Sequence, residues 1–196
     1  SSQPTLYLPA LSKAQAPTGT SPVFPTPTPL PSPTPTATPP TPGAVILSAP
    51  DFNNGGFEAG TMEGWAMANG AIDVDGSFAH TGSYSVHGTG AGSAGSSVAF
   101  YRDYTLLSYQ YWANAGRLQA STSGWFQNGD SEDYRLLVHF IGGSGTDLAT
   151  FDSGWKHDSG SSYVQQVDNN RAVPAGTTVI RLEVQLRRNS GGYTDV

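Results

Sequence analysis

Hydrophobic and polar residues alternate along most of the chain after Gly43. The clearest run is 180–187, where Ile, Leu, Val and Leu at the even positions alternate with Arg, Glu, Gln and Arg at the odd positions. Shorter runs with the same period lie at 83–87, 98–101 and 118–123. A period of two places successive side chains on opposite faces of a strand, so each run predicts a strand with one buried face.

The segment 136–141, Leu-Leu-Val-His-Phe-Ile, is apolar on both faces, which is typical of a strand covered on both sides. We therefore predict that His139 is a hydrogen-bonded core residue. Clusters of Gly, Asn, Asp and Ser separate the runs, and the single helical candidate is a turn or two at 107–113. The pattern predicts an antiparallel β-sandwich over residues 44–196, a length sufficient to close a core.

A proline- and threonine-rich stretch precedes the alternating region. Ten of the 22 residues in 21–42 are Pro and eight are Ser or Thr. Proline fixes its own φ and biases the residue before it toward extended geometry, so residues 18–43 are predicted to form a polyproline II stalk. The alternative is a disordered linker. Ser/Thr-Pro repeats outside cells often carry O-linked glycans, and the candidate attachment sites are Thr26, Thr28, Ser32, Thr34, Thr36, Thr38 and Thr41.

A short apolar segment lies within residues 1–17. The sequence of Thr5–Leu11 is rich in strand formers, although its proline restricts it to an edge strand. A strand this short is not stable alone and has no predicted partner nearby. We therefore expect this segment to add a strand to a sheet elsewhere, through Leu6, Tyr7, Leu8 and Leu11.

Composition argues against several classes of function. The formal net charge is −6 and the Lys and Arg residues are scattered, so we expect no nucleic-acid binding. No apolar run is long enough for a membrane span. The absence of Cys excludes a disulfide framework, thiolate catalysis and a Cys-ligated metal. The absence of Cys leaves the compartment open, and it is the stalk that favours an extracellular or cell-surface protein, whose signal peptide is not part of the sequence.

Motifs that would indicate catalysis are weak. The run 90–95 matches the dinucleotide fingerprint G-x-G-x-x-G, but a strand-like segment follows where that motif needs a helix, so we predict a loop. The His residues lack metal-ligand spacing, and no G-x-S-x-G nucleophile motif occurs. The carboxylates Asp130, Glu132 and Asp133 lie beside turn residues, which favours solvated acids over a glycosidase pair. We predict no enzyme activity and no organic cofactor.

Several short motifs follow one another in a characteristic order: Asn54–Gly60 with Gly64-Trp65, His80–Val86, Ser123–Trp125 with Glu132–Tyr134, Val173–Thr177, and Tyr193–Val196. This set resembles bacterial carbohydrate-binding-module-like jelly rolls of the galactose-binding-like kind. The resemblance implies an all-β, antiparallel jelly-roll β-sandwich in which Trp65 and Trp125 are core residues. Trp112 and Trp155 lie in less regular surroundings and are our candidates for stacking on sugar rings.

The resemblance also implies a structural Ca²⁺. In similar jelly rolls a Glu of the first motif and an Asp of the last strand hold the ion together with backbone carbonyls, which here corresponds to Glu58 and Asp195. Hard oxygen ligands suit calcium. The alternative is a solvated Glu58 and an Asp195 bonded to backbone. Family members continue past that Asp with further apolar residues, whereas this sequence ends at Val196, so we expect a groove of unpaired backbone groups.

Two functions compete. In the leading hypothesis the N-terminal strand inserts into a neighbour's β-sandwich, so that copies of the chain assemble head-to-tail into an extracellular filament. The alternative is a carbohydrate-binding module tethered by a glycosylated linker.

Overall fold

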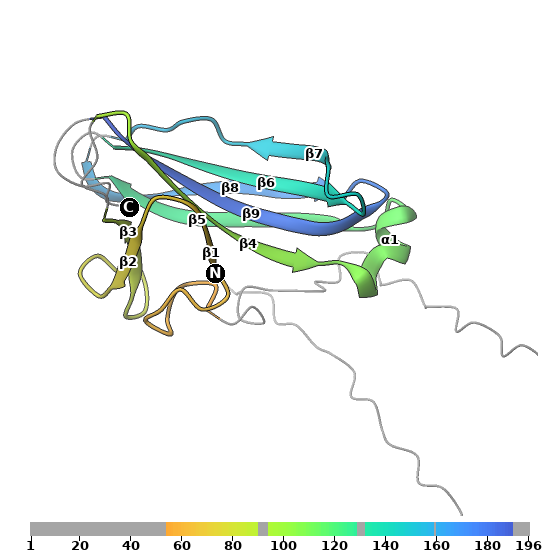
Figure 1. Ribbon diagram of the computed structural model, residues 1–196, viewed down its shortest axis with the longest axis horizontal. Coiled ribbons are helices and arrows are strands. Elements are labelled where there is room, and N and C mark those ends of the chain that lie inside the picture. The colour runs from red at the N-terminus through yellow and green to blue at the C-terminus, as the bar shows by residue number, and fades with distance from the viewer. Residues whose placement is uncertain (1–53, 90–93, 129–131, 159, 190–196) are drawn as a thin grey trace, which may run out of the picture. The chain divides into compact units, whose positions relative to one another are not determined.

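The computed structural model describes residues 54–89, 94–128, 132–158 and 160–189 (Figure 1). The N-terminal segment and the stalk, with the candidate donor-strand and glycan-attachment residues, lie outside the described residues. Within the described part of the chain, no helix is both long enough and apolar enough to cross a membrane.

Five antiparallel strands form the larger sheet, in the order β1-β4-β9-β6-β7. The alternating run 180–187 lies in its central strand, as the pattern predicts for the chain's most regular run. The strands are β1 (Ala66–Asn69), β4 (Ser97–Thr105), β6 (Glu132–Gly142), β7 (Asp147–Asp152) and β9 (Thr177–Arg188).

Two antiparallel pairs pack on one face of this sheet. They are β2 (Ile72–Asp75) with β3 (Ser85–Gly88), and β5 (Gln119–Asn128) with β8 (Gly160–Ala172). The predicted helical turn is confirmed as a 3₁₀ turn followed by a short α1, which spans Gln110–Asn114. Figure 1 shows the larger sheet in front and the β5–β8 pair behind it. The predicted all-β, antiparallel jelly-roll β-sandwich is confirmed.

The core lies between the two layers because strand registers bring apolar side chains into rows. From the opposite layer, Phe126 of β5 packs against the apolar side chains of the larger sheet. Its ring stacks on that of Tyr134, with the ring centroids 4.4 Å apart. Burying each large apolar side chain stabilises the fold by about 1.5–3 kcal/mol. One row across β4, β9 and β6 contains Val98, Leu186 and Tyr134, and the next contains Phe100, Val184 and Leu136.

The first family motif forms a compact loop built around Asn54. The side-chain amide of Asn54 donates to the carbonyls of Thr61 and Glu63 at 2.7 and 3.1 Å, and its Oδ1 accepts from the N–H of Ala59 at 2.8 Å. The indole N–H of Trp65 donates to the carbonyl of Asn54 at 3.0 Å. Trp65 also packs against the core, as the resemblance implies.

Strand β6 is buried on both faces over most of its length. Leu136, Leu137 and Val138 are exposed by only 1%, 6% and 1%, which confirms the prediction from the doubly apolar pattern. The prediction that His139 is a hydrogen-bonded core residue is confirmed for the hydrogen bond and wrong for the core position. Its side chain is on the outer face of the larger sheet, within 2.8 Å of Asp147 and 3.5 Å of Glu183. The apolar neighbours of His139 in sequence do not reveal these carboxylates, because they come from other strands.

The glycine-rich run at 90–95 leads into strand β4 and not into a helix. Residues 90–93 lie outside the described residues. The described end of the run continues with Gly95, whose N–H donates to the carbonyl of Arg188 at 2.7 Å. This geometry confirms that a strand follows the run, so the helix that a dinucleotide site needs is replaced by β4.

Candidate functional site

The outer face of the β5–β8 pair carries an exposed tryptophan. Trp125 and Phe126 are neighbours on β5, so their side chains point to opposite faces. Phe126 is in the core with 4% of its surface exposed, whereas 46% of Trp125 is exposed. The prediction that Trp125 is a core residue is therefore wrong, because the core contains Phe126 and strand geometry turns Trp125 outward.

A shallow depression continues along the same face. The antiparallel register pairs Trp125 with Gln165 and Ser123 with Val167, which sets these side chains side by side. Its volume is about 330 Å³, and its lining combines hydroxyl and amide groups with one apolar side chain and no ionisable group. The lining residues are Ser121, Thr122, Ser123, Gln165, Val167 and Asn169.

An aromatic cluster borders this face at Trp125. His80, from the loop between β2 and β3, stacks on Trp125 with ring centroids 4.1 Å apart and 15° between the planes. Tyr163 of β8 meets His80 edge-on at 4.8 Å. Burial raises the pKa of Tyr163, and its enclosed hydroxyl has no hydrogen-bond partner among the described residues. Because His80 covers one face of the indole, a ligand would contact the part of Trp125 that remains exposed.

A bulge shapes the far end of the depression, and an ion pair lies on the opposite, inner face at the same position. Asn170 has a left-handed φ of 54°, and its N–H donates to Ser121 Oγ at 2.9 Å where the register of β5 and β8 shifts. Arg171 donates to the two oxygens of Asp168 at 2.5 and 2.9 Å and lies over the ring of Phe151 at 4.7 Å. Because Phe151 belongs to β7 of the opposite sheet, this ion pair faces the interior and not the depression.

Such a surface suits a ligand that has both apolar faces and hydroxyl groups. An exposed indole provides a flat apolar contact, while hydroxyl and amide side chains both donate and accept hydrogen bonds. A pyranose ring presents C–H groups on its faces and hydroxyls around its rim, so it matches both features. Among the described residues, no cluster of three or more His, Asp or Glu could hold a metal ion.

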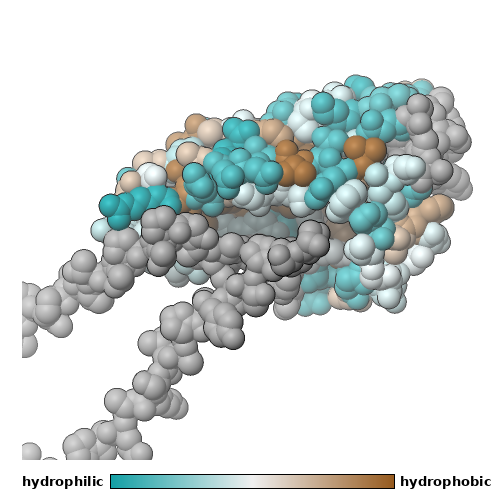
Figure 2. Space-filling view, turned by 180° about the vertical axis from the view of Figure 1, so that it is seen from behind, coloured by the Kyte–Doolittle hydropathy of each residue, from teal (hydrophilic) through white to brown (hydrophobic). Residues whose placement is uncertain are grey.

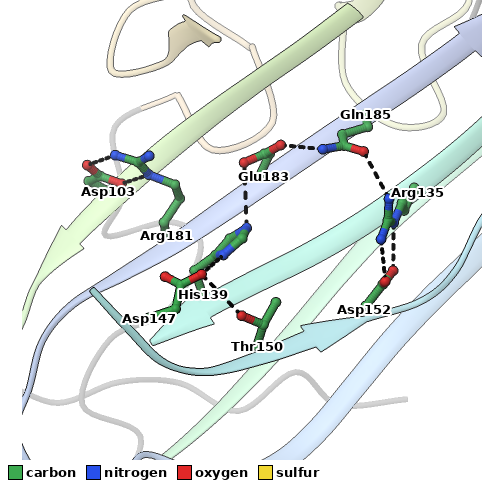
Figure 3. A network of polar contacts seen from close by, with 9 residues as sticks. All are labelled: Asp103, Arg135, His139, Asp147, Thr150, Asp152, Arg181, Glu183 and Gln185. Atoms are coloured by element: carbon green, nitrogen blue, oxygen red, sulfur yellow. Dashed lines mark hydrogen bonds and ion pairs between the residues drawn. The ribbon is translucent and has the colours of Figure 1, made fainter. Parts of the chain in front are cut away.

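The outer face of the larger sheet has a different, charged character (Figure 3). Arg135 pairs with Asp152 across β6 and β7, and Arg181 pairs with Asp103 across β9 and β4. Hydrogen bonds from Arg135 are the main cause that lowers the pKa of Asp152 to about 2. Arg181 also lies over the ring of Tyr101 at 3.8 Å. Each of these cations is neutralised by an anion on an adjacent strand, so the network stabilises the sheet instead of offering a free charge to a ligand.

Trp155, one of the two predicted sugar-stacking residues, lies over this charged face. The guanidinium of Arg187 is 4.4 Å from its ring centroid and that of Arg135 is 5.6 Å away. The expectation that Glu132 and Asp133 are solvated is wrong, because each is only 5% exposed. Arg187 is paired with the buried Asp133, and its hydrogen bonds help to lower the pKa of that carboxyl although burial opposes the shift. The arginines therefore occupy ring surface that a sugar would need.

Trp112, the other predicted residue, lies in α1 at the opposite end of β9. Its neighbour Asn114 accepts the N–H of Gly176, just before β9 begins, at 2.7 Å, whereas Trp155 packs on Arg187 near the end of that strand. Ten residues of strand separate these points by about 33 Å. The structure therefore does not bring the two predicted tryptophans into one site.

The predicted calcium ligands are described only in part. Glu58 accepts the N–H of Ser83 at 2.8 Å, so the first and second family motifs meet at this carboxylate. A Cβ at Gly82 would clash with the Glu58 carboxylate, and the φ of 79° at this position also favours Gly. Asp195 lies outside the described residues, and the calcium site stays a prediction.

No family model and no curated protein matches the sequence. Among solved structures, the chain is similar to TmCBM61, described in complex with beta-1,4-galactotriose, at 19% identity over 72% of this chain and 91% of that chain, with a TM-score of 0.49. It is also similar to the family 22 carbohydrate-binding module of Clostridium thermocellum Xyn10B, at 14% identity over 70% and 90% of the two chains, with a TM-score of 0.48.

A third similar structure is the enzymatically active domain of tailspike protein 4 from Bacteriophage CBA120, at 14% identity with a TM-score of 0.51. The match covers 71% of this chain but only 19% of the tailspike chain. At sequence identities of 14–19%, each of these similarities shows a shared fold and nothing about function. The resemblance to jelly rolls of the carbohydrate-binding-module kind, read from the sequence motifs, is confirmed at that level.

Proposed function

We propose that this chain is a non-catalytic, extracellular carbohydrate-binding module whose binding face is the outer face of the β5–β8 pair. The observation that carries the proposal is the exposed Trp125, aligned with a depression lined by hydroxyl and amide side chains. This combination provides ring stacking and hydrogen bonding on one pair of strands, which suits the binding of a ligand without catalysis.

The face seen in Figure 2 favours a polar ligand over a large protein partner. Where it is not covered by grey atoms, this face is mostly hydrophilic to neutral, and hydrophobic residues occur as separate spots. A stable protein interface usually needs a continuous apolar patch at its centre. The carbohydrate-binding modules among the similar structures have the same fold, and the uncharged depression supplies the chemistry that a sugar requires.

Glycan-panel binding by affinity electrophoresis and calorimetry tests the proposal. The full chain should bind at least one polysaccharide, and Trp125→Ala should weaken binding by about 30-fold or more, the usual cost of removing a central aromatic contact. Tyr111→Ala, which removes an aromatic side chain exposed by 53% on α1, is the matched control and should bind like the unmodified protein. The proposal fails if no glycan binds or if Trp125→Ala binds normally. Loss of binding in Trp155→Ala instead would move the site to the charged sheet.

Strand addition between copies of the chain is a second candidate, favoured by the sheet topology. Within the described residues, β3 pairs only with β2 and β5 pairs only with β8, so the pairing of a further strand with either pair is compatible with the described sheets. Main-chain hydrogen bonds at such an edge give affinity for an extended peptide. The proposed donor is the N-terminal segment with Leu6, Tyr7 and Leu8.

Deleting residues 1–12 tests strand addition. The truncated protein should be less stable and should not form filaments visible by electron microscopy. A free peptide with the deleted sequence should restore the stability without restoring filaments. Equal stability and unchanged assembly after the deletion would exclude strand addition and leave carbohydrate binding as the sole candidate.

A further inference from the structure

We infer that the outer face of the β5–β8 pair selects an uncharged polysaccharide and binds an internal stretch of it, two or three sugar rings long. This inference rests on the proposed function and names the class of ligand for that site. It follows from three properties of the face: the chemistry of its lining, the pairing of the charges around it, and its length.

The lining has nothing that could neutralise an acidic sugar. Its side chains are three hydroxyls, two amides and one valine. A carboxylate or sulfate held here would lose water without gaining an ionic partner, which is strongly unfavourable. A neutral sugar hydroxyl both donates and accepts, and so do the hydroxyl and amide groups that it would meet.

Three of the arginines on these two sheets are already paired with carboxylates. Arg171, next to the depression in sequence, is committed to Asp168 and faces the interior. The arginine pairs with Asp152 and Asp103 lie on the outer face of the other sheet. The formal net charge of −6 adds a repulsive long-range field for polyanions. The uncharged lining and the negative net charge therefore both disfavour uronates and sulfates.

The length of the face sets the length of the ligand. Trp125 and Ser121 are four residues apart on β5, a distance of about 13 Å at the usual strand rise. The depression between them is shallow and lies on an exposed sheet face, so a chain can pass across it in both directions. A di- or trisaccharide stretch spans this distance, and nothing in the lining requires a chain end.

Matched polysaccharides test the inference. Each backbone is offered in a neutral and an acidic form, for example hydroxyethyl- and carboxymethylcellulose, or methyl-esterified and free polygalacturonate. The neutral form should bind at least about tenfold more tightly, because an unpaired carboxylate is costly to desolvate. Its affinity should not change between low and moderate salt. Oligosaccharide affinity should rise up to the trisaccharide and then level off, with no effect of reducing the chain end.

A gain-of-charge variant makes the test specific to this face. Val167→Lys places a cation in the depression, where Val167 is 43% exposed, and should strengthen binding of the acidic form by roughly two- to fivefold in a salt-dependent manner. Leu148→Lys, at 45% exposure on β7, is the matched control and should have no effect.

Three results would overturn the inference. Acidic forms that bind as tightly as neutral ones, with a response to Trp125→Ala, would refute the selectivity while the proposed function stands. Affinity that depends on a free chain end would refute the internal binding mode. Absence of glycan binding, or binding that is indifferent to Trp125→Ala, would refute the proposed function and the inference together.

Discussion

Asn54 is the residue whose replacement most directly tests how the first family motif folds. Its side chain makes three hydrogen bonds to backbone groups of one loop, at 2.7, 3.1 and 2.8 Å. Its φ of 61° is left-handed, a conformation that Asn tolerates and Ala does not. Each hydrogen bond contributes about 0.5–1.5 kcal/mol net, and because the loop is partly solvated we take the lower half of that range, about 2 kcal/mol in total. The left-handed backbone adds about 1 kcal/mol for Ala.

Asn54→Ala should therefore lower the free energy of unfolding by about 3 kcal/mol, and Asn54→Gly by about 2 kcal/mol, since Gly adopts positive φ freely. For a domain of this size, the alanine variant should lose roughly 6–12 °C in melting temperature. Equilibrium unfolding in urea, followed by tryptophan fluorescence and circular dichroism, measures both variants on the full chain. The reasoning is refuted if Asn54→Ala is within about 0.5 kcal/mol of the unmodified protein, a change typical of inert surface positions, or if the glycine variant is the less stable of the two.

Three further predictions concern acid stability, the buried tyrosine and calcium. The pKa of Asp152 is lowered to about 2 in the folded protein, so its pairing with Arg135 stabilises the fold above pH 4 and is lost as the pH falls toward 2. Because the carboxylate is 39% exposed and screened by solvent, we expect the free energy of unfolding to fall by at most about 1 kcal/mol over this pH range. Unfolding curves measured at a series of acid pH values should show this decline, and Asp152→Asn should reduce it. Tyr134→Phe removes the hydroxyl that bonds to Asp158 and accepts a hydrogen bond from Gln166 at 3.0 Å. The free energy of unfolding measured in urea should fall by about 1–2 kcal/mol, and unchanged stability would contradict this prediction. If calcium binds through Glu58, a chelator should lower the melting temperature and Glu58→Ala should remove that response, whereas a chelator-insensitive melt would exclude the ion.

Strand positions were predictable from the sequence because alternation is a local property of extended backbone. The run 180–187 and the doubly apolar segment 136–141 both form strands of the larger sheet, since side chains two residues apart share a face wherever the strand lies. The short helix at 110–114 and the strand after the glycine-rich run follow from equally local signals. The motif at Asn54–Gly60 with Trp65 could be recognised in the sequence because it is a local structure. Its hydrogen bonds join residues no more than eleven positions apart.

The candidate site could be located only from the tertiary structure. Alternation shows that Trp125 and Phe126 face opposite sides of β5, but only packing against Tyr134 decides which of them is buried. The depression joins residues of β5 and β8 that are about 45 positions apart in the sequence. His80, in the loop between β2 and β3, stacks on Trp125, which is 45 positions further along the chain. The charges that surround His139 and Trp155 likewise come from separate strands. Local sequence determines which residues can form a strand, whereas strand register and layer packing decide which side chains meet, because those contacts form only when distant segments pair.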